Sequence, residues 1–241
     1  MAAQQNPSRV ALVTGGTGGL GAAVIRAFLD RGCAVAVTYR GDAEIGALRA
    51  AIPAAGERLL PVKADLTDTD QVAQAVRQVV GNYSRIDYLV NLVGGWAGGK
   101  FVWETTDAEW ERMLTLNLRT VFACCRAVVP QMIAQGFGRI VNVSTRTAVQ
   151  PAPGAAAYAV SKRGVITLTE TLALEVRDRG DVTVNCVLPS VIDTPANRQS
   201  MAGADFSRWV RPEQLAAIIA WLTSDEATPI SGAAIPVYGR A

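Results

Sequence analysis

The fold is decided by the stretch Thr14-Gly15-Gly16-Thr17-Gly18-Gly19-Leu20-Gly21. It joins an apolar run, Val10–Thr14, to an amphipathic pattern, Leu20–Arg31, so a strand is predicted to turn directly into a helix. Glycines at such a junction let the backbone approach a pyrophosphate, and the helix N-terminus then offers unpaired N–H groups. The spacing fits G-x-G-x-x-G and T-G-x-x-x-G-x-G equally well. The stretch therefore predicts a nucleotide-binding turn.

Short apolar runs alternate with amphipathic ones along the rest of the chain. Strands are predicted near Val10–Thr14, Ala34–Thr38, Leu59–Lys63, Ile86–Asn91, Arg139–Ser144, Val182–Leu188 and Ala233–Val237. Helices are predicted near Leu20–Arg31, Asp42–Ile52, Thr69–Asn82, Ala108–Ala134, Ala155–Arg179 and Pro212–Thr223. Apolar strands separated by helices indicate a mainly parallel sheet that is covered on both faces.

This pattern predicts one domain over residues 1–241. Its fold class is α/β, a single doubly wound, Rossmann-like domain with a seven-stranded sheet. We expect residues 1–8 to form a flexible N-terminus. We expect residues 189–210, the longest irregular stretch, to form a substrate-binding loop, since a loop of this length in a compact domain is usually functional.

Composition excludes several classes of function. The 241 residues are 50% hydrophobic and carry 23 basic against 21 acidic side chains, so no basic stripe for nucleic acid is expected. There is no histidine, which excludes Ser-His-Asp and Cys-His catalysis and histidine-ligated metals. The four cysteines form no C-x-x-C pair, and we predict no metal site. No apolar stretch is long enough for a transmembrane helix, so a cytoplasmic protein with no membrane or nucleic-acid partner is expected.

The end of the second predicted strand bears on the choice of dinucleotide. An acidic residue there would hold a ribose 2′-hydroxyl, whereas an arginine accepts a 2′-phosphate. The strand ends in Tyr39-Arg40 without a carboxylate at its tip. NADP(H) is therefore favoured over NAD(H).

A tyrosine and a lysine four residues apart, Tyr158 and Lys162, lie near the start of a predicted helix and share one of its faces. A tyrosine has an ordinary pKa near 10 and needs a stabilised phenolate to exchange protons at neutral pH. A cation about 4 Å away favours the phenolate by about 4 kcal/mol at an effective dielectric constant of 20. The pair is thus a candidate for general acid–base catalysis.

Polar residues at three other places in the sequence support a catalytic role for this pair. Ser144 ends the fifth predicted strand, and Asn91-Leu-Val-Gly94 ends the fourth at the same edge of the sheet, where ligands bind in parallel α/β folds. Asn117 lies in the middle of a predicted helix, where asparagine is a poor helix former and indicates a specific role.

With these motifs, together with Asp65-Leu66 and Pro189…Thr194-Pro195, the whole chain resembles the short-chain dehydrogenase/reductase family. The resemblance implies that Tyr158 is the general acid and that Ser144 binds the substrate oxygen. It implies that Lys162 binds the nicotinamide ribose and lowers the pKa of the tyrosine, and that Asn117 holds a water in a proton relay. The chain departs from the family pattern at Leu92-Val93, where Asn-Ala is usual, and at Ser190, where glycine is usual.

The motif and the resemblance together give a set of expected cofactor-binding residues. These are Gly15, Thr17, Gly18, Gly19, Leu20, Gly21, Tyr39, Arg40, Asp65, Leu66, Asn91, Gly94, Tyr158, Lys162, Pro189, Val191, Ile192 and Thr194. The resemblance also implies a homodimer or homotetramer built on the two long helices near 108–134 and 155–179.

Two segments, 94–99 and 193–209, look like the corresponding parts of dihydropteridine reductases, a branch of the same family. Trp96, Phe206 and Trp209 could then frame a flat ring, with Arg198 near its polar edge and Arg146 also in the substrate pocket. Phe206 and Trp209 could equally only anchor the loop to the body of the domain.

The function that we predict is NADPH-dependent reduction of a carbonyl group, or oxidation of the matching alcohol, on a small substrate that can be cyclic or aromatic. Dihydropteridine reductases typically lack the serine and the asparagine that this chain has as Ser144 and Asn117. They also carry an acidic residue at the positions that match Tyr39 and Arg40. Reduction of a quinonoid or C=N ring is therefore the alternative and not the first prediction. A more remote alternative is a dinucleotide-sensing regulator without turnover, since fold alone does not imply activity.

Overall fold

The computed structural model describes residues 9–240, so the flexible N-terminus expected at 1–8 lies outside the described residues. Seven strands form one sheet in the order β3-β2-β1-β4-β5-β6-β7, and every neighbouring pair is parallel. Their bounds are β1 Val10–Thr14, β2 Ala34–Tyr39, β3 Leu59–Lys63, β4 Tyr88–Asn91, β5 Phe137–Val143, β6 Asp181–Pro189 and β7 Ala234–Val237. The predicted α/β class and strand count are confirmed.

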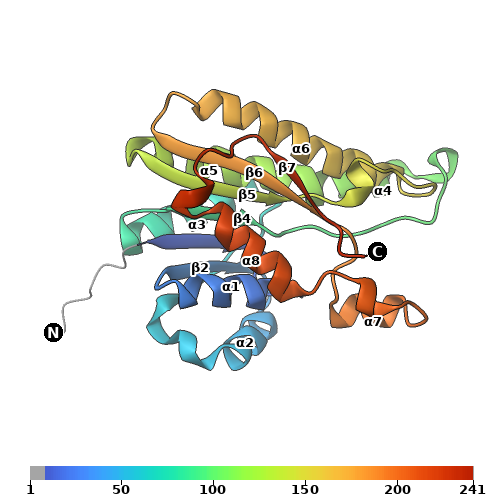
Figure 1. Cartoon of the computed structure of the whole chain (residues 1–241), viewed down its shortest axis with the longest axis horizontal. Helices are drawn as coiled ribbons and strands as arrows, with labels where there is room; N and C mark the ends of the chain where they lie inside the picture. Colours follow the sequence, from blue (N-terminus) through green and yellow to red (C-terminus); the bar gives the residue numbers. More distant parts are fainter. Residues whose placement is uncertain (1–8, 241) are drawn as a thin grey trace.

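Helices cover both faces of this sheet (Figure 1). One face packs against α1 (Gly21–Asp30), α2 (Asp42–Ala51) and α8 (Pro212–Leu222). The other packs against α3 (Thr69–Tyr83), α5 (Thr120–Ala134) and α6 (Ala156–Val176). Each face thus has its own apolar core, as the unbroken apolar strands require.

The helix predicted at 108–134 is two helices. A capping box begins α4 (Asp107–Leu114), where Thr106 Oγ1 accepts from the Glu109 amide at 3.3 Å and the Thr106 amide donates to the Glu109 carboxylate at 3.1 Å. A π-helical turn, Thr115–Arg119, then separates α4 from α5. Such turns break the regular hydrogen-bond ladder and often lie at functional sites, and Asn117 is in the middle of this one.

Residues 107–134 are also long and apolar enough to cross a membrane by length and composition alone. Within that span α5 buries Val121, Cys124 and Val128 in the core and packs on α3, β4 and β5. A core helix of this kind passes the same test, so the span gives weak evidence for a membrane segment.

The stretch predicted as one irregular loop at 189–210 contains ordered structure. A short helix, α7 (Pro195–Ser200), is capped by Thr194, whose Oγ1 accepts from the Asn197 amide at 3.2 Å. A 3₁₀ turn follows at Phe206–Arg208. The two ends of the stretch are joined because Ile192 pairs with Val210. Proline at the first helical position and threonine before it were the local signals for α7.

The remaining short 3₁₀ turns lie on connections. They are Pro53–Arg58, Val102–Glu104, Arg146–Ala148 and Asp225–Ala227.

The strand order reverses between β1 and β4, and all strands have their carboxyl ends at one edge of the sheet. Buried polar side chains fix the strands just below that edge. Asn91 Nδ2 donates to Asn142 Oδ1 at 2.9 Å, Thr14 Oγ1 donates to Asn91 Oδ1 at 3.3 Å, and Asn142 Nδ2 donates to Thr169 Oγ1 at 2.9 Å. A crevice at such a reversal is where α/β sheets bind ligands.

Candidate active site

The glycine-rich turn after β1 is shaped by backbone that other residues would not adopt. Gly15 has φ +65°, and the Gly18 amide donates to the Gly15 carbonyl at 3.0 Å. A Cβ at Gly21 would lie 1.9 Å from the carbonyl oxygen of Gly16, so the first residue of α1 can only be glycine. The turn therefore brings the N-terminus of α1 to the crevice with its amides uncovered by side chains.

A cleft of about 330 Å³ opens beside this turn, across the carboxyl ends of β1, β2, β3 and β4. The predicted cofactor-binding residues that line it are Gly15, Thr17, Gly18, Tyr39, Arg40, Asp65, Leu66 and Gly94. Sequence reasoning missed Thr38, Glu44, Ala64, Thr67, Leu92, Val93, Leu116 and Thr120, which complete the lining. An open glycine cradle that leads into an elongated cleft fits a dinucleotide.

Three charged side chains line this cleft. Two hydrogen bonds from Thr67 hold the pKa of the Asp65 carboxyl below its ordinary value, and the Arg40 guanidinium adds to the effect. Glu44, from the first turn of α2, accepts a hydrogen bond from Thr17 Oγ1 at 3.2 Å. The lining of the cleft thus holds one arginine and two carboxylates.

Several residues expected to bind cofactor have structural contacts instead of a place in the cleft lining. Gly19 lies against Thr194, since a Cβ there would be 2.7 Å from the threonine methyl group. Leu20 is buried in the core, and the Asn91 amide is occupied by the interstrand bonds described above.

The first residues of the 189–210 stretch are similarly held by backbone bonds. The carbonyl oxygens of Pro189, Val191 and Ile192 accept from Thr145 Oγ1, the Val210 amide and the Thr194 amide. These contacts fix the start of the stretch to Thr145, after β5, and to the far end of the stretch at Val210.

The end of β5 and the start of α6 bring the candidate catalytic side chains together. Ser144 Oγ donates to the backbone carbonyl of Lys162 at 2.8 Å, and Lys162 Nζ donates to the carbonyl of Val143 at 2.9 Å. A Cβ at Gly94 would lie 2.9 Å from Lys162 Nζ, so the ammonium adjoins the dinucleotide cleft. The catalytic set and the cleft therefore form one site.

The pKa values at this site correct one expectation. Burial raises the pKa of Tyr158, and the group that opposes this is Thr145, through a hydrogen bond between the two side chains. Lys162 is not among the groups that shift this pKa, and its Nζ donates to the Val143 carbonyl at 2.9 Å. Burial lowers the pKa of Lys162 itself to about 8. Sharing a helix face was not enough to predict where the ammonium points.

Thr145 is a residue that sequence reasoning missed. It is buried next to Ser144, and its Oγ1 also accepts from the Thr147 amide at 3.4 Å. A hydroxyl directly after Ser144 was the available signal.

Asn117 forms a clamp on the segment after β4. Its Oδ1 accepts from the Gly95 amide at 2.8 Å, and its Nδ2 donates to the Gly95 carbonyl at 3.1 Å and to Ser161 Oγ at 3.2 Å. Ser161 Oγ in turn donates to the Tyr158 carbonyl at 2.8 Å. The side-chain amide thus links the π-helical turn, the cleft and the first turns of α6.

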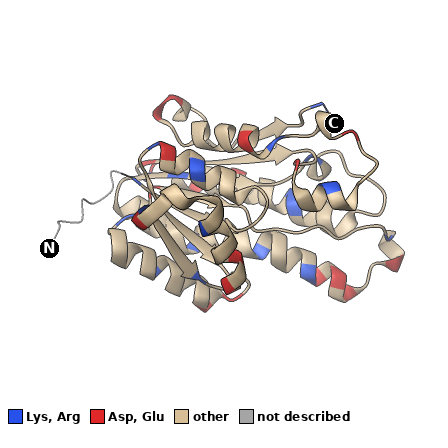
Figure 2. Ribbon diagram, turned by 90° about the horizontal axis from the view of Figure 1, so that it is seen from below, with Lys and Arg blue, Asp and Glu red and all other residues tan. Residues whose placement is uncertain are grey.

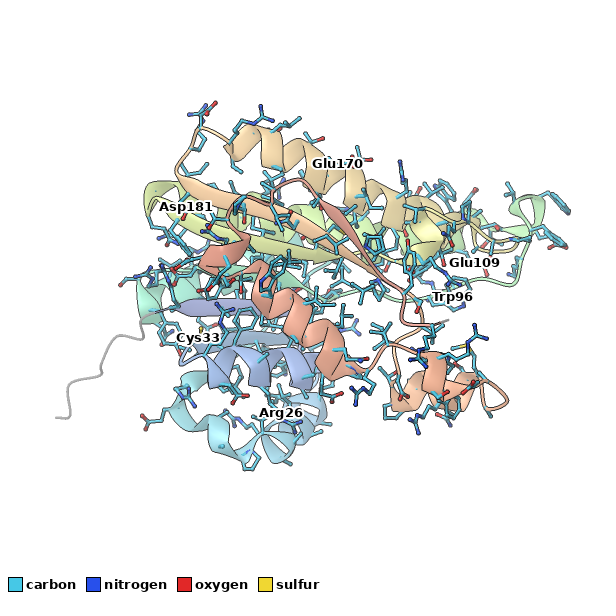
Figure 3. All side chains as sticks on the ribbon, viewed as in Figure 1. Arg26, Cys33, Trp96, Glu109, Glu170 and Asp181 are labelled. Carbon is cyan, nitrogen blue, oxygen red and sulfur yellow. The ribbon has the colours of Figure 1, made fainter. Side chains whose placement is uncertain are left out.

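The five expected substrate-pocket residues fall into separate places. Trp96 lies at the same end of the molecule as Glu109 (Figure 3), and its ring meets the Tyr158 ring edge-on at 4.7 Å. Arg146 lies over the Tyr238 ring at 5.6 Å. Phe206 packs on Trp209 at 4.7 Å. Arg198 lies over Phe206 at 4.8 Å and pairs with Asp193. Only Trp96 touches the candidate catalytic tyrosine in these contacts.

Comparison with known proteins decides the family. The family model described as short chain dehydrogenase matches residues 9–205. The chain belongs to the short-chain dehydrogenase family. Among its relatives, a 3-oxoacyl-[acyl-carrier-protein] reductase of Thermotoga maritima is 33% identical, with 96% of each chain covered. An acetoacetyl-CoA reductase of Allochromatium vinosum is 32% identical, with 96% of this chain and 98% of the relative covered.

A solved short-chain dehydrogenase structure agrees with these relatives. The structure of a single-residue variant of actinorhodin polyketide ketoreductase with NADPH superposes with a TM-score of 0.89 at 30% identity, covering 96% of each chain. The chain is therefore an NAD(P)-dependent oxidoreductase, and the regulator without turnover is set aside.

Proposed function

We propose that this short-chain dehydrogenase uses NADPH to reduce the 3-oxo group of an acyl thioester to a hydroxyl group. The observation that carries the proposal is that Ser144 is bonded to Lys162, that Thr145 next to Ser144 is bonded to Tyr158, and that the Lys162 ammonium adjoins Gly94 in the cleft lining. The relatives described above are named for reduction of 3-oxoacyl groups or of acetoacetyl-CoA, which gives the substrate class. Their names give no support to the dihydropteridine alternative.

The residues at the site divide the chemistry among them. Bound NADPH supplies the hydride for the carbonyl carbon. Tyr158 donates a proton to the carbonyl oxygen, since a phenol with an ordinary pKa near 10 is protonated at neutral pH and burial raises the pKa further. Ser144 turns its hydroxyl from the Lys162 carbonyl to the substrate oxygen, and Lys162 supplies a cation at the ribose end of the cleft. Asn117 holds the Gly95 segment that borders both, with a proton-relay role carried over from the family.

The preference for NADPH rests on Arg40, which lines the adenosine end of the cleft and can pair with a 2′-phosphate. The compared ketoreductase structure contains NADPH, which supports the same choice. We propose in addition a homodimer or homotetramer, since α5 and α6 leave apolar side chains exposed. We also propose a cytoplasmic location.

A cyclic ketone is the second candidate substrate, and Trp96 is the observation that favours it. Its indole is 60% exposed and stands edge-on to the ring of Tyr158. A flat ring could stack on the free face of the indole while its carbonyl meets the phenol.

The test follows NADPH and NADH oxidation by the purified protein with an acetoacetyl thioester, a cyclic ketone and a quinonoid dihydropterin. We expect the thioester to be reduced fastest and with NADPH. Tyr158→Phe should lower kcat by about 10²- to 10⁴-fold while NADPH still binds, as the loss of a proton donor predicts. Reduction of the dihydropterin alone, or full activity of Tyr158→Phe, would contradict the proposal.

A further inference from the structure

A second hollow, of about 710 Å³, shares no lining residue with the dinucleotide cleft. It is built by the residues around α7, the 3₁₀ turn at Phe206–Arg208, the start of α8 and the end of the C-terminal segment. Figure 1 shows these parts of the chain together at the end of the molecule where the strands have their carboxyl ends. Its charged lining residues are Arg198, Arg208, Arg211, Arg240 and Asp193.

The charge of this hollow is unbalanced. Asp193 pairs with Arg198, with distances of 2.5 and 2.7 Å to its Nε and Nη2, so these two charges offset each other. Among residues 9–240 the lining has no carboxylate besides Asp193, so none lies opposite Arg208, Arg211 and Arg240 there. Asp205, outside the lining, is near Arg208, but its carboxylate accepts two bonds from Ser207. Elsewhere the ribbon carries basic and acidic residues interspersed (Figure 2).

The wall that carries these arginines is firmly held. Arg208 Nε donates to the Arg240 carbonyl at 2.8 Å, and the Arg240 amide donates to the Arg208 carbonyl at 3.0 Å. Gly239 has φ +61°, and a Cβ there would lie 2.9 Å from the Arg208 carbonyl oxygen. The C-terminal segment is thus fixed to the 3₁₀ turn, and the arginines are presented from two joined segments.

The same segments reach the catalytic edge on their other side. Thr194, next to Asp193, contacts Gly19 of the glycine-rich turn. Tyr238, two residues before Arg240, lies under Arg146, which follows Ser144 by two residues. The segments that line the hollow therefore also contact the glycine-rich turn and the residue two positions after Ser144.

We propose that this hollow binds the phosphate groups of a coenzyme A thioester whose 3-oxo group is reduced at Tyr158. The inference rests on the proposed function, because it needs a thioester substrate. Guanidinium groups form paired hydrogen bonds with phosphate oxygens, and several arginines match the several phosphates at the nucleotide end of coenzyme A. In this proposal the uncharged pantetheine arm joins the bound phosphates to the thioester at Tyr158. The phosphopantetheine of a carrier protein has a single phosphodiester and leaves most of the arginines unused.

The experiment compares acetoacetyl-CoA with the acetoacetyl thioester of N-acetylcysteamine, which has the same reacting group and no phosphate. In the double variant Arg211→Gln/Arg240→Gln we expect KM for acetoacetyl-CoA to rise about tenfold. KM for the short thioester and kcat for both should stay as in the wild type. Both arginines are exposed, so the protein should fold normally. The matched control is Arg77→Gln, at an exposed arginine on α3, which should leave KM for both thioesters unchanged.

Salt and a third substrate complete the design. Added salt should raise KM for acetoacetyl-CoA only, because it screens exposed charges. If the double variant changes KM equally for both thioesters, or for neither, the hollow does not bind the phosphates. The proposed reduction of a thioester would not be affected by that result. If acetoacetyl phosphopantetheine binds as tightly as acetoacetyl-CoA, the nucleotide end is not recognised and the inference is wrong. If neither thioester is reduced but a cyclic ketone is, the proposed function fails first and the inference with it.

Discussion

The hydroxyl of Thr145 has the most direct effect on the chemistry among the residues that the sequence did not point to. Burial raises the pKa of Tyr158, and the hydrogen bond from Thr145 opposes that rise. In the direction of alcohol oxidation the phenolate must accept a proton, so the rate increases as the pH rises through the pKa of Tyr158. Removing the bond should therefore move this increase to higher pH.

Thr145→Val, which keeps the shape and removes the hydroxyl, is the variant for this prediction. We expect its pH profile for alcohol oxidation to have a higher midpoint than that of the wild type, whereas Thr145→Ser keeps the wild-type midpoint. Steady-state rates across pH measure it, with NADP⁺ saturating. A midpoint that is unchanged in the valine variant would show that Thr145 has only a packing role.

The proposed preference for NADPH is tested at two of the three charged residues that line the cleft, Arg40 and Glu44. In that proposal Arg40 attracts the 2′-phosphate, and Glu44, held by Thr17, repels it. We expect Glu44→Gln to lower KM for NADPH about two- to fivefold, the size of an exposed charge interaction, with no change for NADH. Arg40→Ala should raise KM for NADPH by a similar factor.

The control for these variants is Glu57→Gln, an exposed carboxylate at the other end of β3. It should leave KM for NADPH and KM for NADH unchanged. Equal changes for NADPH and NADH in Glu44→Gln would mean that the carboxylate acts on the shape of the glycine-rich turn and not on the 2′-phosphate.

At the scale of elements, the glycine-rich turn and α1 form one unit whose packing excludes a side chain at Gly21. A Cβ there would lie 1.9 Å from the Gly16 carbonyl oxygen, so Gly21→Ala must shift the turn or the helix. We expect a loss of about 1–3 kcal/mol in the free energy of unfolding, the range for overpacked sites, and a loss of NADPH binding. Urea unfolding and NADPH fluorescence titration measure the two effects.

A matched glycine is available in the next helix. Gly46 is inside α2, and a Cβ there would meet nothing within 4 Å. Gly46→Ala should therefore stabilise the protein by about 0.5–1 kcal/mol, since alanine has less backbone freedom to lose. If both variants destabilise equally, the close approach at Gly21 does not explain the glycine.

Sequence reasoning was most reliable where one local pattern decides an element. The bounds of β1 and β3 agree with prediction, because one apolar run decides each strand. It was least reliable where tertiary contacts decide. The π-helical turn around Asn117 depends on the fit between α4, α5 and the Gly95 segment. The spacing of apolar residues in the sequence does not indicate such a fit.

The candidate site shows the same division. The glycine spacing and the strand ends predicted which residues line the cleft, because these follow from topology. The direction of the Lys162 side chain and the partner of the Tyr158 hydroxyl follow from packing at the end of β5, which the sequence does not reveal. Arg198, Phe206 and Trp209 pack on one another and on Asp193, and their place in the substrate pocket stays a prediction.

For the whole molecule, the outer faces of α5 and α6 bear on assembly. Both helices are packed in the core on one side, yet Phe122 and Ile133 on α5 and Val160 on α6 are 44%, 37% and 47% exposed. Apolar side chains of this size on adjoining helices favour contact with a second copy. Because Asn117 and Tyr158 lie on the same helical layer, self-association would also brace the active site.

The double variant Phe122→Glu/Ile133→Glu tests this arrangement by placing two charges on the α5 face. We expect the wild type to sediment as a dimer or tetramer and the variant as a monomer with reduced kcat, as burying unpaired carboxylates in an interface is costly. Met201→Glu, at an apolar residue 38% exposed near α7, is the control and should keep the wild-type assembly. A wild type that is monomeric at assay concentration, or a variant that sediments as the wild type does, would place the interface elsewhere. The catalytic layer would then be stable within one chain.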